Sequence, residues 1–302
     1  YFIGKVGDTA LAALSFAFPI LMVVTSVAIG LGAGTSSVVA RAIGSDDERR
    51  ARRLATDSLF LSFAATTVIA IIGALTVDPT FLLLGAPASM LPLIQEYMFY
   101  LYLSVPFLVV AMVGLASMRA TGDTRLPSKL MVVAAVINVV LDPLFIFGFG
   151  PIPELGLNGA GLAALVSRLC IFAATLYYMR FRTNMLSFKM PDVAEMMSSW
   201  RDVLHVGIPA AGTNAIIPAA MGIVTAMLAR HGPEAVAGFG VASRIESLTL
   251  VVFYALSAVI GPFVGQNMSA GKADRIAHSL RLSTLFCLGA GLLIAVLLAA
   301  LV

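Results

Sequence analysis

The sequence predicts an all-α protein that crosses a membrane several times, and two observations carry this prediction. Of the 302 residues, 60% are apolar and only 12% are charged, and the mean hydropathy is +0.98. Soluble domains carry about 25% charged residues. The apolar residues also recur along the whole chain in runs of about 20, the length that a helix needs to cross a bilayer. This composition excludes a water-soluble enzyme, a disordered chain and a nucleic-acid-binding domain.

Eight membrane-spanning helices are predicted in order along the chain. They cover about residues 12–40, 54–77, 97–118, 129–149, 157–179, 203–229, 235–265 and 277–302. Turn-forming residues mark several breaks between them, at Asp78-Pro79, Thr121-Gly122-Asp123, Gly150-Pro151-Ile152-Pro153 and His231-Gly232-Pro233. Proline inside several spans removes a helical hydrogen bond, so kinked helices are expected. In the first span, Gly30, Gly32 and Gly34 predict close packing against another helix.

Lys and Arg gather in alternate loops. Of the 19, only Lys5 and Arg230 lie on one side of the expected membrane, and Arg168 and Arg244 lie within spans. The other fifteen fall in or beside the loops after the first, third, fifth and seventh spans: Arg41, Arg49, Arg50, Arg52, Arg53, Arg119, Arg125, Lys129, Arg180, Arg182, Lys189, Arg201, Lys272, Arg275 and Arg281. Basic loops face the cytoplasm. The sequence therefore predicts a multi-pass protein of the bacterial plasma (inner) membrane, with those four loops cytoplasmic and residue 1 outside.

An internal repeat relates the two ends of the chain. At an offset of 225, Ala10, Ala12, Ala17, Ile20 and Val39 recur as Ala235, Ala237, Ala242, Ile245 and Val264. At 226, Arg49, Ala51, Leu54, Leu59 and Phe60 recur as Arg275, Ala277, Leu280, Leu285 and Phe286. The second copy begins six spans after the first, and an even number leaves both copies facing the same way, which predicts two parallel six-helix lobes. We expect eight of the twelve helices here, five in a lobe at 1–190 and three in a lobe at 191–302, with one span before Tyr1 and three after Val302.

Six short motifs, in order along the chain, resemble those of one transporter family. They are Gly7–Ala13, Arg119–Thr124 with Pro127, Asn138–Gly148, Gly156–Ala160, Gly207-Ile208-Pro209 and Val264–Asn267. The chain is similar to the MATE family (multidrug and toxic compound extrusion), most of all to its DinF-type bacterial branch. The resemblance implies a twelve-helix, two-lobe fold and export of amphipathic, often cationic small molecules in exchange for H⁺ or Na⁺. A lipid-linked sugar or polysaccharide flippase of the same superfamily stays open as the alternative, although it needs a more basic cavity than Arg168 and Arg244 provide.

The fourth predicted span holds a candidate site for the coupling cation. An ionisable side chain inside the membrane is a functional candidate, because lipid solvates charge poorly. Asn138 and Asp142 are four residues apart and share one helix face. Such a pair can take up a proton or bind Na⁺; alternatively Asp142 is structural and pairs with Arg168. The resemblance implies that Asn138 and Asp142 belong to a cation-coupling cluster, and that Tyr97 supplies its hydroxyl, since residues 159–164 contain no Thr. The alternative interpretation is that Tyr97 is an aromatic residue of the membrane interface.

Four residues are candidates for the substrate cavity: Arg168, Asn214, Arg244 and Glu246. Arg244 and Glu246 point to different faces of the seventh span, where Glu246 can attract a cation or each can pair with a helix outside this chain. We expect no metal site and no cofactor, because the His and Cys residues are widely spaced and Gly265–Lys272 departs from a phosphate-binding loop. The expected protein is a monomer and not an enzyme, and its partners are small organic cations and membrane lipids but no nucleic acid.

Overall fold

The computed structural model describes residues 2–3, 7–149, 153–187 and 192–301. This part of the chain forms long helices joined by short turns, with 3-10 turns at Ala88–Met90 and Ala229–His231. The α-helices are α1 (Asp8–Gly44), α2 (Glu48–Leu75), α3 (Val77–Leu83), α4 (Leu91–Ala120), α5 (Arg125–Ile146), α6 (Gly156–Phe181), α7 (Val193–Leu228), α8 (Pro233–Ser269) and α9 (Ala273–Leu301).

Each predicted span corresponds to one long helix, which confirms the all-α membrane class. Eight helices in the described part of the chain are long and apolar enough to cross a membrane. These eight helices begin before the predicted first residues because polar residues start each helix ahead of its apolar stretch; α7 begins at Val193 and not near 203. At the other end, α2 and α5 stop at Leu75 and Ile146, before the predicted residues 77 and 149. The predicted lobe boundary at 190–191 lies outside the described residues, as do Lys5, Lys189 and most of the predicted turn at 150–153.

The break predicted at Asp78-Pro79 does lie between the spans α2 and α4, but the prediction that these residues form a turn is wrong. Both residues lie in the first turn of α3, a helix of seven residues that follows α2 after one residue. Proline is tolerated there because the first N–H groups of a helix have no intrahelical partner. The side chains of Val77 and Phe81, both in α3, are buried, so this short helix closes one end of the bundle.

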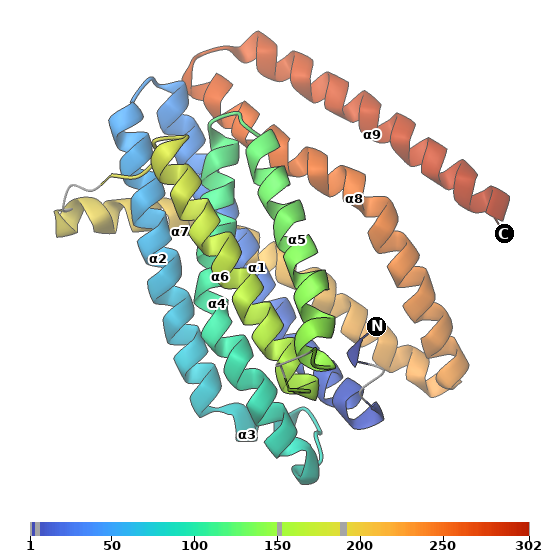
Figure 1. Ribbon diagram of the computed structural model, residues 1–302. Coiled ribbons are helices and arrows are strands. Elements are labelled where there is room, and N and C mark those ends of the chain that lie inside the picture. Colours follow the sequence, from blue (N-terminus) through green and yellow to red (C-terminus); the bar gives the residue numbers. More distant parts are fainter. Residues whose placement is uncertain (1, 4–6, 150–152, 188–191, 302) are drawn as a thin grey trace.

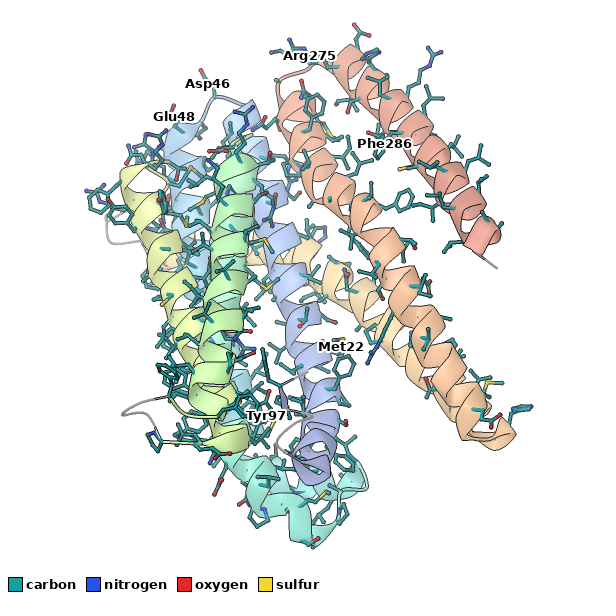
Figure 2. All side chains as sticks on the ribbon, turned by 45° about the vertical axis from the view of Figure 1, so that its right-hand side comes forward. Met22, Asp46, Glu48, Tyr97, Arg275 and Phe286 are labelled. Atoms are coloured by element: carbon teal, nitrogen blue, oxygen red, sulfur yellow. The ribbon has the colours of Figure 1, made fainter. Side chains whose placement is uncertain are left out.

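The basic loops gather at one end of the molecule. The turns α1–α2, α4–α5 and α8–α9 lie at this end, and the chain leaves α6 there (Figure 1). We call it the basic end, formed by residues 41–53, 119–129, 180–187 and 269–281. Figure 2 places Asp46, Glu48 and Arg275 at this end and Tyr97 toward the opposite one.

Glycine brings α1 and α7 into close contact, as the predicted small-residue packing requires. A Cβ atom on Gly30 would lie 2.5 Å from the Cβ of Ala211, and one on Gly34 would lie 2.3 Å from the carbonyl oxygen of Val203. On α7, a Cβ on Gly207 would lie 3.0 Å from the carbonyl oxygen of Gly30. We call these five residues the glycine seam, and it fixes the first part of α7 against α1.

Helix α8 touches α1 at the basic end and diverges from it toward the other end (Figures 1 and 2). A Cβ on Gly44 would lie 2.2 Å from the carbonyl oxygen of Gln266, and one on Gly265 would lie 3.2 Å from the Cβ of Ala40. The Gln266 amide donates a hydrogen bond to the carbonyl oxygen of Ala120 on α4, with an N–O distance of 2.6 Å. The molecule is therefore a V that is closed at the basic end.

The helix bounds reproduce the internal repeat. Helices α1 and α8 both have 37 residues, and their first residues, 8 and 233, differ by 225, as do their last, 44 and 269. Helices α2 and α9 begin at residues 48 and 273, again 225 apart. The same pair of helices with the same turn between them thus occurs twice along the chain.

Candidate functional site

The candidate site begins with a polar pair on α5. The Asn138 amide donates a hydrogen bond to the Asp142 carboxylate, and its Nδ2 lies 3.3 Å from Oδ1. Both side chains are half-buried, and their spacing places them on one helix face as predicted. Pro143 follows within the helix, and a proline has no N–H to donate to the carbonyl of Val139 one turn earlier. An additional carbonyl oxygen is thereby released next to Asn138.

Tyr97 reaches the same region from α4. Only 8% of its surface is exposed, whereas an aromatic residue of the interfacial belt presents its ring to the lipid. Arg168 on α6 and Asp142 on α5 both lie within electrostatic range of the Tyr97 hydroxyl. Tyr97 thus faces the inside of the bundle, where three helices contribute to one group of residues. We call this group the polar cluster: Tyr97, Ser104, Asn138, Asp142 and Arg168.

Arg168 is held by a neutral partner. Its Nη1 donates a hydrogen bond to the hydroxyl oxygen of Ser104, 2.5 Å away on α4, and Ser104 is fully buried. The ion pairs recorded among the described residues are Arg50–Asp202, Arg52–Glu48 and Arg53–Asp57. The alternative in which Arg168 pairs with Asp142 is therefore wrong for this conformation, and the two charges of the polar cluster are held by different neighbours.

The other three cavity candidates lie on α7 and α8, and not on the helices α4, α5 and α6 that carry the polar cluster. Asn214 on α7 donates its amide to the carbonyl of Ala210 in its own helix, at 2.8 Å. Arg244 and Glu246 are exposed on α8. Within the described residues, no recorded hydrogen bond or ion pair joins these three side chains to the polar cluster. Their roles stay predictions.

A buried ion pair on α2 was missed at the level of sequence. Arg53 Nε lies 2.9 Å from Asp57 Oδ2, and Arg53 Nη2 lies 2.6 Å from Oδ1. Asp57 is fully buried and Arg53 is 7% exposed. The prediction that Arg53 belongs to a loop is wrong, because α2 begins at Glu48 and Asp57 neutralises the arginine one turn later. The signal was an opposite-charge pair four residues apart inside a helical run.

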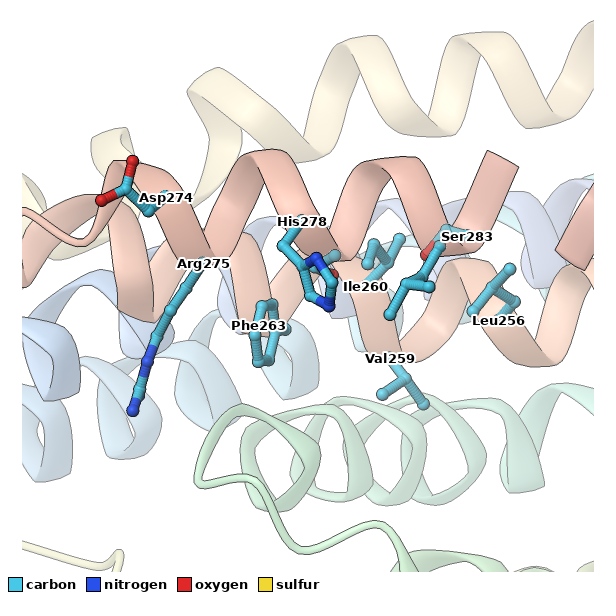
Figure 3. A pocket seen from close by; sticks show the side chains of 10 residues that line it. Leu256, Val259, Ile260, Phe263, Asp274, Arg275, His278 and Ser283 are labelled. Carbon is cyan, nitrogen blue, oxygen red and sulfur yellow. The ribbon is translucent and has the colours of Figure 1, made fainter. Parts of the chain in front are cut away.

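A cavity of about 650 Å³ lies between α8 and α9 (Figure 3). Its α8 wall is apolar and includes Val259, Ile260 and Phe263, while α9 contributes Arg275 and His278. None of the predicted site residues lines it. The cavity is therefore separate from the polar cluster.

Comparison with known proteins relates the chain to membrane transporters. The family model MatE matches residues 1–144 and 209–302. The FAD transporter of Shewanella oneidensis is 42% identical over 288 residues, which cover 95% of this chain and 64% of that protein. The probable multidrug resistance protein NorM of Thermotoga maritima is 27% identical over 97% of this chain and 64% of its own length. The multidrug export protein MepA of Staphylococcus aureus is 22% identical over 90% and 60%. The chain thus spans 60–64% of the length of these relatives.

Solved structures show the same arrangement of helices. A mutant form of the Vibrio cholerae MATE transporter VcmN superposes with a TM-score of 0.93 at 31% identity, covering 98% of this chain and 66% of that one. An outward-facing multidrug resistance MATE transporter gives a TM-score of 0.88 at 26% identity, covering 98% and 65%. The family match extends over well over half of the chain, and its members are transporters and not enzymes. The chain belongs to the MATE family of membrane transporters.

Proposed function

We propose that this chain forms part of an exporter of small organic molecules driven by H⁺ or Na⁺, and that Asp142 binds the coupling cation. The observation that supports this best is the Asn138–Asp142 pair beside Tyr97, inside a membrane-spanning helix and without a basic partner among the described residues. A bound cation neutralises such a carboxylate and removes the unfavourable energy of its charge. Carboxylate, amide and hydroxyl oxygens are also the groups that bind hard cations.

The V supplies the conformational part of the proposal. Its closed end carries the basic loops, so the positive-inside rule favours the cytoplasm for that end and the outside for the open end, in a bacterial plasma (inner) membrane. Export then requires the V to open at the basic end and close at the other. Antiport follows when cation and substrate stabilise opposite states. In this proposal the parts of a monomer before and after residues 190–191 are the two lobes that move.

The substrate that we favour is a flavin dinucleotide. The chain is 42% identical to the FAD transporter but only 22–27% identical to MepA and NorM. The named relatives carry small molecules, which favours a small-molecule exporter over the lipid-linked sugar flippase. Their order of identity favours FAD over the amphipathic cations that the family resemblance implied.

The test is FAD efflux from proteoliposomes that contain the full transporter chain and a proton or Na⁺ gradient. Valinomycin with equal K⁺ on both sides clamps the membrane potential, because FAD is an anion and 100 mV alone moves each charge by about 2.3 kcal/mol. The variant Asp142→Asn is compared with Glu154→Gln, which removes an exposed carboxylate from the segment before α6.

We expect gradient-driven efflux to fall to background in the Asp142→Asn variant while FAD binding is retained. The Glu154→Gln control should stay within about twofold of the wild type, as surface substitutions usually do. Gradient-driven efflux by the Asp142→Asn variant would contradict the coupling role. A wild-type protein that exports a cationic dye but no FAD would instead contradict the substrate assignment.

A further inference from the structure

We propose that Arg168, supported by Ser104 and Tyr97, binds a phosphate group of the exported dinucleotide. This inference rests on the export function proposed above and adds the part of the substrate that the polar cluster recognises. Two observations carry it: the hydrogen bond between α4 and α6, and the lack of an ion pair at Arg168 within the part of the chain that the structure describes.

Arg168 lies deep inside a membrane-spanning helix. It follows the first residue of α6, Gly156, by twelve positions, which at 1.5 Å per residue is about 18 Å along the axis. A charge at such a depth faces the bundle interior or a water-filled cavity, pairs with other polar groups, and marks a candidate pathway for a substrate or an ion. Among the described residues its recorded partner is the neutral hydroxyl of Ser104, and no recorded ion pair includes it. A positive charge is therefore available to a ligand.

The carboxylate of the polar cluster does not fill that role. Asp142 accepts a hydrogen bond from Asn138 on its own helix, and the buried Tyr97 side chain lies within electrostatic range of both Asp142 and Arg168. The polar cluster thus has an acidic part on α5 and a basic part on α6. In this proposal the coupling cation binds at Asp142 and the substrate phosphate binds at Arg168. The cation and the phosphate therefore do not compete for the same atoms.

The chemistry of the basic part matches a phosphate. A guanidinium has five N–H donors and Ser104 takes up one of its nitrogens, so donors remain for a bidentate contact with two phosphate oxygens. Tyr97 and Ser104 are seven residues apart on α4 and share its face. Since Arg168 is only half-buried, its side chain remains accessible at the surface of the bundle.

The same charge argues against a cationic substrate at this position. An uncompensated guanidinium repels an amphipathic cation and attracts an anion. Among flavins, riboflavin has no phosphate, FMN has one and FAD has two in a pyrophosphate. The proposal therefore predicts that Arg168 distinguishes FAD and FMN from riboflavin, and that it contributes little to the binding of the flavin ring.

The experiment measures binding of riboflavin, FMN and FAD to the full transporter chain in a phospholipid-free maltoside detergent, by flavin fluorescence. The variants are Arg168→Gln and Arg168→Lys, and the control is Arg182→Gln at the exposed end of α6. We expect Arg168→Gln to weaken FAD and FMN by about 10- to 100-fold, as for the loss of charge-assisted hydrogen bonds. Riboflavin binding should change less than threefold, which also shows that the variant is folded. Arg168→Lys should lie between, because it keeps the charge and loses the bidentate geometry.

Equal weakening of all three flavins, or none, in the Arg168→Gln variant would overturn the phosphate assignment while leaving the proposed export function intact. Wild-type protein that binds no flavin would overturn the phosphate assignment together with the flavin substrate proposed above. A lipid headgroup presents the same phosphate chemistry, so phosphatidylglycerol is added in a parallel titration. Arg168-dependent binding of that lipid, with FAD affinity equal in wild type and variant, would assign the site to lipid and overturn the dinucleotide proposal.

Discussion

The buried pair on α2 shows how a membrane helix carries two charges at the level of single residues. Arg53 and Asp57 contact each other through two nitrogen–oxygen pairs and are almost completely enclosed. The Trp200 indole on α7 donates to the carbonyl oxygen of Asp57, so the pair lies where α7 meets α2. Removing one partner of a buried ion pair is more unfavourable than replacing both by apolar residues.

We predict that Asp57→Asn lowers the free energy of unfolding by about 3 kcal/mol, the effect of removing one partner of a buried ion pair. The double variant Arg53→Met, Asp57→Met should recover most of this loss. The exposed pair Arg52–Glu48 provides the control, and Glu48→Gln should change stability by less than about 1 kcal/mol. Chemical unfolding of the purified protein in detergent measures all three. A loss below about 1 kcal/mol for Asp57→Asn would show that water or another group compensates Arg53.

At this scale the sequence predicted positions better than partners. The spacing of Asn138 and Asp142 correctly predicted that they share a face, because helix geometry alone decides it. The partner of Arg168 was not predictable, since Ser104 lies 64 residues away on another helix and its pairing depends on how α4 packs against α6. Whether Tyr97 is buried depended on the same packing.

The contact between α1 and α7 is decided by whole elements. Glycine at positions 30 and 34 lets the two backbones approach until no Cβ atom fits between them. Small-residue surfaces of this kind stabilise helix pairs in membranes through close van der Waals contact. Because the first part of α7 is fixed to α1, movement of α8 and α9 relative to the rest requires α7 to bend beyond the glycine seam, where Pro218 interrupts its hydrogen bonds.

We predict that Gly34→Ala destabilises the protein by about 1–3 kcal/mol, because the new methyl group would lie 2.3 Å from the backbone oxygen of Val203. Gly212→Ala on α7 is the matched control, since a Cβ there meets nothing within 4 Å. It should be neutral or stabilising by up to about 1 kcal/mol, in line with helix propensity. Unfolding curves of the two variants separate the effects. Equal stability of the Gly34→Ala and Gly212→Ala variants would mean that the glycine seam opens without loss of stability, and would contradict the prediction.

Apolar length explains why the long elements were predictable and the short one was not. A run of about 20 apolar residues stands out in any sequence, so α1, α2 and α4–α9 were expected. Helix α3 has seven residues and begins with Asp and Pro within its first turn, which is also the composition of a turn. The burial of Val77 and Phe81 distinguishes this short helix from a turn.

At the scale of the whole molecule, the internal repeat was predictable from the sequence, whereas the V shape was not. The offset of 225 between α1 and α8 follows from residue identities and reappears in the helix bounds. The V depends on which glycines and amides meet across the basic end, such as Gln266 with Ala120. The Gln266–Ala120 contact joins residues 146 positions apart, and hydropathy carries no information about such contacts.

The proposed orientation of the V predicts a labelling pattern. After Cys170→Ser and Cys287→Ser remove the two native thiols, single cysteines at Asp47 and Asp123 should react with a membrane-impermeant maleimide only from the cytoplasmic side. Cysteines at Pro79 and Glu154 should react only from outside. Labelling of intact cells and of inverted vesicles makes the comparison. Reaction of Asp47 and Glu154 positions from the same side would contradict the orientation.

If Asp142 couples cation binding to substrate binding, the substrate displaces the coupling cation when it binds. Calorimetry of FAD binding in buffers of different ionisation enthalpy counts the protons released, and the same titration at increasing Na⁺ detects competition by that ion. For the full transporter chain, coupling through Asp142 predicts either proton release or a fall in FAD affinity with Na⁺, because cation and substrate stabilise opposite states. The Asp142→Asn variant should bind FAD and lose both effects. Proton release or Na⁺ competition that persists unchanged in this variant would contradict a coupling role for Asp142.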